Sequence, residues 1–247
     1  MGTLQQERSL VLASASPRRR EILGQLGVEF RIEPSGMDES MLPGEGPKTH
    51  VERLAREKGL QVRERLQDAA DRPCVLSADT VVLLDGIVYG KPVDDADALR
   101  MLRNLSGRTH QVLTGIALCE VRGAFSESLV LATEVTFRTL DEPTMRGYVA
   151  SGEARDKAGS YAIQGLGTGR VRGIQGSYTN VVGMPAVAAA TERVNLYTNV
   201  LKTPLREPLL VAKSLGSIAA LFPGRIGLGV GLSRIPEEFQ GLGQEMK

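Results

Sequence analysis

LVLASASPRRREILGQLG, residues 10–27, decides how this chain begins to fold. An apolar run, 10–13, leads into small polar residues, a proline and three arginines, and then into apolar residues at helical spacing. This order predicts a strand, a tight turn and a helix, with Ser16 as N-cap and Pro17 at the first helical position. The free N–H groups of a helix N-terminus and nearby arginines favour phosphate binding. A capping serine and solvated arginines explain the motif as well.

Working outward, strands and helices follow one another up to about residue 186. Strands are predicted at 28–32, 75–77, 81–84, 87–89, 111–121 and 129–138, and helices after residue 47, from Asp94 and around Pro143. Some neighbouring strands are joined as hairpins and others through helices. We therefore expect an α/β fold with a mixed sheet.

The composition is that of an ordinary globular protein. The chain has 247 residues, of which 42% are hydrophobic and 24% charged, and its net charge of +1 offers no basic excess for nucleic acid. The two cysteines lie in no paired motif, the first residues are polar, and no apolar run could span a bilayer. We expect a cytoplasmic protein with neither a membrane nor a nucleic-acid partner, and a homodimer stays open.

Several polar residues stand where chemistry needs them. Asp79 and Thr80 end an apolar strand, where a carboxylate can hold a hard cation or activate water, although a turn-capping aspartate looks the same. Lys58 falls on the apolar stripe of its helix, and with Lys91 it can neutralise a polyphosphate, although either could be a solvated charge. Gln164, in a glycine-rich loop, can read a base edge or merely satisfy its own loop.

Other chemistries find less support. The two histidines, His50 and His110, have no ligand partner at helical spacing, and no Walker A loop is present. Aromatic residues make up 4% of the chain, too few for a base-stacking platform.

Taken together, these segments resemble the Maf family over about residues 8–186. Besides residues 10–27, the motifs in family order are LAREK (54–58), SADT (77–80), GKP (90–92), LSGR (105–108), DKAGSYAIQG (156–165) and NVVGMP (180–185). The resemblance implies an elongated, mixed-sheet fold like that of inosine triphosphate pyrophosphatase, with a central cleft. It also implies hydrolysis of a nucleoside triphosphate between its α- and β-phosphates, with Mg²⁺ or Mn²⁺ as cofactor.

The resemblance further assigns roles by position. Asp79 would be catalytic, and Asp79 with Glu39 would bind the metal. The triphosphate would be bound by Ser14, Arg18, Lys58 and Lys91. Base preference would depend on Arg18, Thr80 and Gln164, the residue types of the dTTP/UTP type.

The tail, residues 187–247, does not fit that family. Residues 188–242 resemble a fragment of the luciferase-like monooxygenases, flavin enzymes built as TIM barrels. Their spacing predicts helices at 186–191 and 209–221 and strands at 196–201 and 226–232. A TIM barrel needs eight such units in roughly 250 residues, so we expect an appended segment without oxidoreductase activity. It would be a fusion remnant or a family-specific extension.

Three other functions stay open beside the pyrophosphatase of dTTP and UTP. One is a pyrophosphatase of broader or purine preference, and another is a regulatory or interaction protein of cell division with little catalysis. A flavin-dependent oxidoreductase is the weakest, because the tail is far too short for the barrel.

Overall fold

The computed structural model describes residues 9–25, 28–123, 126–184, 196–202 and 226–231. The chain divides into two compact units, Met1–Ala186 and Val187–Lys247. In the second unit, β8 (Leu196–Lys202) and β9 (Ile226–Gly231) form a parallel pair, which confirms both strands predicted in the tail. The helices predicted at 186–191 and 209–221 lie outside the described residues.

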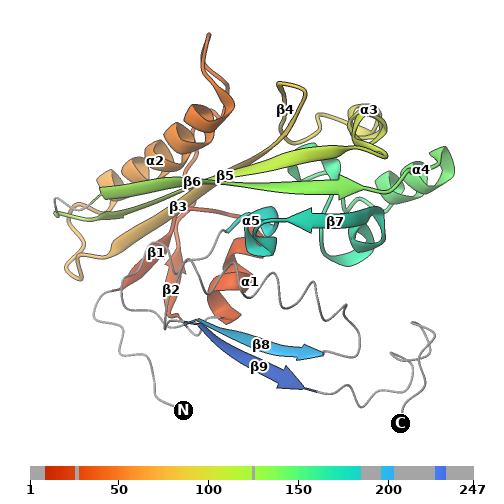
Figure 1. Ribbon diagram of the computed structural model, residues 1–247. Helices are drawn as coiled ribbons and strands as arrows, with labels where there is room; N and C mark the ends of the chain where they lie inside the picture. Colours follow the sequence, from red (N-terminus) through yellow and green to blue (C-terminus); the bar gives the residue numbers. More distant parts are fainter. Residues whose placement is uncertain (1–8, 26–27, 124–125, 185–195, 203–225, 232–247) are drawn as a thin grey trace. The chain divides into compact units, whose positions relative to one another are not determined.

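The first unit is built on one sheet of seven strands (Figure 1). The sheet is mixed, as predicted. The strands are β1 (Leu10–Leu12), β2 (Phe30–Ile32), β3 (Cys74–Leu84), β4 (Ile87–Tyr89), β5 (Thr109–Glu120), β6 (Ser126–Phe137) and β7 (Val171–Gln175). Their order is β2-β1-β3-β5-β6-β7, with β4 paired to β3. The pairs of β1 with β2 and with β3 are parallel, and the others are antiparallel.

The long strand β3 corrects one prediction. Asp79 does not stand at a strand end, because β3 continues through it and pairs with β5 without interruption from Cys74 to Leu83. The other edge of β3 does change there: β1 pairs with it up to Leu76, and β4 pairs with it only from Val82. Residues 77–81 therefore face a gap between β1 and β4, and polar side chains are tolerated in mid-strand because they border this gap.

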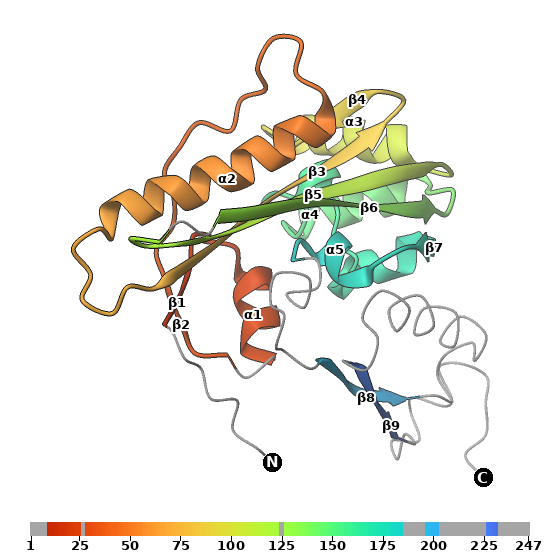
Figure 2. The ribbon, with the colours of Figure 1, turned by 60° about the vertical axis from the view of Figure 1, so that its left-hand side comes forward.

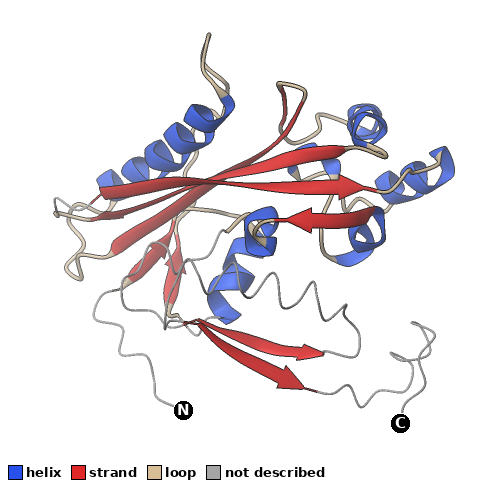
Figure 3. Ribbon diagram, in the orientation of Figure 1, coloured by secondary structure: helices blue, strands red, loops and turns tan. Residues whose placement is uncertain are grey.

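Five α-helices and two short 3₁₀ helices of the described residues surround the sheet. They are α1 (Pro17–Gln25), α2 (Pro47–Arg65), α3 (Asp95–Leu105), α4 (Glu142–Ala150), α5 (Tyr178–Val182), η1 (Ala158–Ser160) and η2 (Gly165–Arg170). The helix α2 crosses one face of β3, β5 and β6, and α5 lies against the opposite face (Figure 2). Near one end of the long strands, α3 and α4 pack together over the largest apolar core (Figure 3). Within the described residues, no helix is long and apolar enough to cross a membrane.

Glycine allows α2 to lie unusually close to the sheet. A Cβ added to Gly115 on β5 would stand 2.2 Å from the carbonyl oxygen of Val51 on α2. One added to Gly59 on α2 would stand 2.7 Å from Oγ of Ser77 on β3. That same Ser77 hydroxyl donates to the carbonyl of Ala55 at 2.6 Å. This close approach brings Lys58, the residue before Gly59 on the helix, within reach of β3.

Candidate active site

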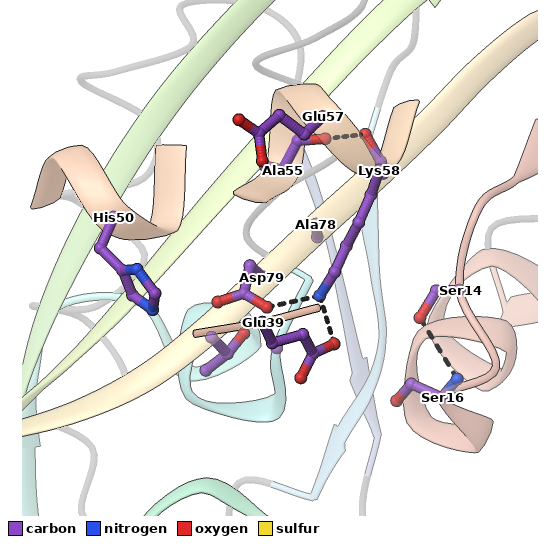
Figure 4. Close-up of polar contacts among 12 residues, drawn as sticks. Ser14, Ser16, Glu39, His50, Ala55, Glu57, Lys58, Ala78 and Asp79 are labelled. Atoms are coloured by element: carbon purple, nitrogen blue, oxygen red, sulfur yellow. Dashed lines mark hydrogen bonds and ion pairs between the residues drawn. The ribbon is translucent and has the colours of Figure 1, made fainter. Parts of the chain in front are cut away.

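Lys58 joins two carboxylates at the gap in the sheet edge (Figure 4). Its side chain is 6% exposed, and its ammonium lies 2.6 Å from Oδ1 of Asp79 and 2.6 Å from Oε1 of Glu39. The ammonium of Lys91, from the loop after β4, lies 3.3 Å from the other oxygen of Glu39. A lysine on the inward face of a helix, the anomaly seen in the sequence, is thus explained by its partners.

The four charges of this cluster balance, and the two lysines favour the ionised form of Glu39. Burial raises the pKa of Glu39, but the hydrogen bonds and charges of Lys58 and Lys91 outweigh burial and hold that pKa below its ordinary value. Buried charges of opposite sign stabilise one another only while they stay paired. An incoming polyphosphate can replace the carboxylates as the partner of the lysines. The carboxylate oxygens are then available to bind a cation.

The turn before α1 forms a second wall of the site. The helix begins at Pro17, as predicted, and Oγ of Ser14 accepts a hydrogen bond of 3.2 Å from the backbone N–H of Ser16. Arg18 is a quarter exposed, and its guanidinium lies 3.9 Å from the carboxylate of Asp156, a long and weak pair. Its charge is therefore available to a ligand at the N-terminus of the helix.

Arg19, for which no role was predicted, behaves in the opposite way. Its guanidinium donates to Oγ of Ser14 at 3.0 Å, to the carbonyl of Ala78 at 2.9 Å, to Oγ1 of Thr80 at 3.2 Å and to the carbonyl of Gly183 at 2.7 Å. Burial lowers the pKa of Arg19, although the guanidinium keeps its charge. This side chain ties the turn before α1 to β3 and to the end of α5.

Spacing could have revealed this difference between the two arginines. Leu23 is the buried residue of α1, and Arg19 stands one helical turn before it on the same face. Arg18 points elsewhere on the helix. The signal was present in the sequence, but a charged residue at an apolar position is easily attributed to solvent.

Thr80 continues the polar contacts away from Asp79. Successive side chains of a strand point to opposite faces, so Asp79 faces α2 and Thr80 faces α5. Oγ1 of Thr80 lies 3.0 Å from Oγ1 of Thr114 on β5, and the Thr114 hydroxyl donates to the carbonyl of Asn180 at 3.1 Å. The side chain of Asn180 in turn donates to Oγ1 of Thr133 at 2.9 Å. This network lies beneath the NVVGMP motif and explains its asparagine.

One cleft of about 760 Å³ collects all of the predicted site residues, within the range typical of ligand pockets. It is lined, among others, by Ser14, Arg18, Glu39, Lys58, Asp79, Thr80, Lys91 and Gln164. Gln164 directly precedes η2, in the loop that follows the DKAG motif.

The carboxylates suit a cation that is shared with the ligand. Within the described residues, no group of three or more His, Cys, Asp or Glu side chains could by itself hold a metal ion. Mg²⁺ is commonly bound by one or two carboxylates together with substrate phosphates, rather than by a full protein cage. Asp79 and Glu39, bridged by a single ammonium, match that donor set.

Comparison with known proteins agrees with this site. Residues 9–192 match a family model described as Maf-like protein. The chain belongs to this family. Each residue to which the Maf motifs assign a role lies inside the matched segment, and each lines the same cleft.

Relatives in this family are similar over most of their length. A protein named dTTP/UTP pyrophosphatase from Escherichia coli O157:H7 is 52% identical over 179 residues, or 72% of this chain and 88% of the relative. Proteins of the same name are 49% identical in Anaeromyxobacter dehalogenans, over 73% of this chain and 90% of the relative, and 43% identical in Syntrophomonas wolfei, over 77% and 99%.

Two further matches are less informative. A solved structure, the Staphylococcus aureus Ham1 protein, has a TM-score of 0.38 and 12% identity over 72% of this chain and 84% of that chain, which is too low for any conclusion. A second family model, luciferase-like monooxygenase, matches residues 149–247. This match overlaps the Maf-like match over residues 149–192. The resemblance of the tail is thereby confirmed, and its lack of oxidoreductase activity stays a prediction.

Proposed function

We propose that this protein hydrolyses nucleoside triphosphates, preferably dTTP and UTP, between the α- and β-phosphates to a nucleoside monophosphate and pyrophosphate. The observation that carries the proposal is Lys58, whose ammonium lies 2.6 Å from both Asp79 and Glu39 in a cleft that also opens onto the N-terminus of α1. The relatives bear the name of this activity.

The triphosphate is bound by cations from three elements. Arg18 and the free N–H groups of α1 receive phosphate oxygens on one side, with the hydroxyl of Ser14 beside them. Lys58 and Lys91 receive them on the other side, after giving up part of their contact with Glu39. Because these groups already stand in the cleft, the developing negative charge meets donors that need little reorganisation.

A divalent cation such as Mg²⁺ or Mn²⁺ would neutralise phosphate charge, and Asp79 and Glu39 would hold it. Lys58 engages Oδ1 of Asp79, so we assign Oδ2 to orient and deprotonate the attacking water. The water oxygen then bonds to the α-phosphorus, the bond from that phosphorus to the bridging oxygen breaks, and pyrophosphate leaves. The proton passes to Asp79 and from there to solvent.

Base selection falls to the opposite side of β3. Thr80 and Gln164 line the cleft with groups that can donate or accept hydrogen bonds. Arg18 also lines the cleft and contributes both to phosphate binding and to base preference. We infer a house-cleaning role in the nucleotide pool of the cytoplasm. Neither Cys74 nor Cys119 forms a disulfide bond within the described residues, which supports a reducing compartment.

Pyrophosphate release tests this proposal. The purified chain is assayed with Mg²⁺ or Mn²⁺ on dTTP, UTP, CTP, GTP, ITP and 7-methyl-GTP, and we expect dTTP and UTP to be the best substrates. Asp79→Asn should abolish release, whereas the matched control Asp85→Asn, in the exposed turn between β3 and β4, should retain it. Release at near the wild-type rate in Asp79→Asn would overturn the catalytic assignment.

Metal dependence is tested separately with Glu39. Chelation by EDTA should stop release, and Mg²⁺ should restore it. Glu39→Gln loses one charged ligand, so the Mg²⁺ concentration for half-maximal rate should rise by roughly tenfold or more. An unchanged Mg²⁺ requirement in this variant would remove Glu39 from the metal site.

A further inference from the structure

The hydroxyl oxygen of Thr80 accepts a hydrogen bond whose donor and acceptor cannot exchange roles. Its donor is the Nη2 group of Arg19 at 3.2 Å, and a guanidinium has donors but no acceptor. One lone pair of Thr80 Oγ1 is therefore occupied. What the hydroxyl presents to the cleft depends on where its own proton points.

A buried neighbour decides where that proton points. Thr114 is 0% exposed, and its single hydroxyl proton is taken by the carbonyl of Asn180 at 3.1 Å. The contact of 3.0 Å between Thr80 and Thr114 is then made by the proton of Thr80. This chain, from Arg19 through both threonines to Asn180, gives every hydroxyl proton an acceptor. The reverse arrangement leaves the Thr80 proton without a partner in the network.

We propose that Thr114 is a positioning residue that holds Thr80 as a hydrogen-bond acceptor toward the cleft, and that this polarity selects a base with a ring N–H. Uracil and thymine carry such a donor at N3, whereas N3 of cytosine is an acceptor and would place two lone pairs face to face. The inference rests on the proposed function, and it deepens it by naming the chemical feature that the site reads.

The test changes Thr114, which does not line the cleft. Thr114→Val keeps the shape and removes the hydroxyl, so the Thr80 proton can turn into the cleft. Thr114→Ser keeps the hydroxyl and is the matched control. The probes are UTP and CTP analogues with an imido group between the α- and β-phosphates, and calorimetry gives their dissociation constants for each protein.

We expect the wild type and Thr114→Ser to bind the UTP analogue more tightly than the CTP analogue. In Thr114→Val that preference should fall by about tenfold, the order of one hydrogen bond made or lost. An unchanged preference, or a loss of affinity that is equal for both analogues, would overturn the inference.

Binding keeps this test separate from catalysis. If the wild type binds the analogues but releases no pyrophosphate from UTP, the proposed reaction fails while the preference still decides the role of Thr114. If the wild type binds neither analogue, both proposals fall. Thermal unfolding of each variant shows whether the fold is intact.

Discussion

The two faces of β3 treat buried polarity in different ways. On the face toward α2, Asp79 meets Lys58, and both are charged groups that a phosphate or a cation can engage in turn. On the face toward α5, Thr80 meets Arg19 and Thr114 in a chain of hydrogen bonds that runs into the core. Asp79 and Thr80 are adjacent in sequence, so one strand places a side chain in each of the two environments.

This difference teaches how the site divides its work. Charges that balance one another can change partners when a charged ligand arrives, which suits chemistry at phosphorus. A network in which every hydroxyl proton has an acceptor cannot rearrange without leaving a buried group unpaired, which suits recognition. Changes on the α2 face should therefore alter the rate, and changes on the α5 face should alter the preference for a base.

The largest effect is expected at Asp79. In Asp79→Asn the side chain keeps its size but loses its charge and most of its basicity, so turnover of UTP should fall by about 10³-fold. Pyrophosphate release measures this, and circular dichroism checks the fold. A loss of less than about tenfold would contradict the division between the two faces, because the charged face would then be dispensable.

Lys58 and Lys91 should differ although both contact Glu39. Lys58→Met leaves two carboxylates facing each other without their buried cation, and kcat/KM should fall by about 10²-fold. Lys91 is 59% exposed and contacts one oxygen, so Lys91→Met should cost roughly tenfold. The same assay compares the two variants. Equal losses would mean that burial on the α2 face adds nothing to the role of Lys58.

On the α5 face of the sheet, His110 is a buried titratable residue. It is 2% exposed, and its Nε2 atom lies 2.7 Å from the hydroxyl oxygen of Tyr161. Burial lowers the pKa of His110 from 6.5 to about 4. Between those values the unfolded chain binds a proton that the folded protein does not, so stability should fall as pH drops from 6.5 toward 4 and then level off. The expected change is about 3 kcal/mol, at about 1.4 kcal/mol for each pH unit between the two pKa values.

Urea unfolding at several pH values measures this change, with His110→Gln as the comparison. The variant should lack this part of the pH dependence. A wild type and a variant with parallel stability curves from pH 7 to about 4 would show that His110 is not held neutral by burial.

The smallest effect concerns the close approach of α2. Gly115→Ala would place a methyl group 2.2 Å from the carbonyl oxygen of Val51, and the helix must move away at a cost of about 1–3 kcal/mol. Gly147→Ala is the matched control, because nothing lies within 4 Å of that position on α4, and there alanine should stabilise the helix by up to about 1 kcal/mol. Urea unfolding compares them. Equal stabilities would show that contact with α2 does not depend on this glycine.

Much of the fold was predictable because local signals agreed with one another. The turn before α1 and the helix start at Pro17 followed from residue types alone, as did Asp94, whose side chain accepts a hydrogen bond of 2.7 Å from the N–H of Asp97. The length of β3 was not predictable, because its polar residues read as an end when the partner strand β5 and the gap beside it are unknown.

The site was predictable in its members but not in its contacts. Ordered motifs identified Lys58 and Asp79, yet only the packing of α2 against β5 shows that they touch. Arg19 escaped notice because the sequence marks three arginines alike, and Thr114 because a threonine within a strand of strong β-propensity carries no signal of its own. Residues that look alike in the local sequence are distinguished by their contacts with segments far apart in the chain.

The most direct test of the division between the faces is a kinetic comparison of four proteins on UTP and CTP: the wild type, Asp79→Asn, Thr80→Val and the double variant. Asp79→Asn should lower kcat for both nucleotides by the same factor, Thr80→Val should narrow the preference for UTP while keeping kcat within about tenfold, and the double variant should show both effects. A Thr80→Val enzyme that loses turnover on both nucleotides, with its preference unchanged, would contradict the account.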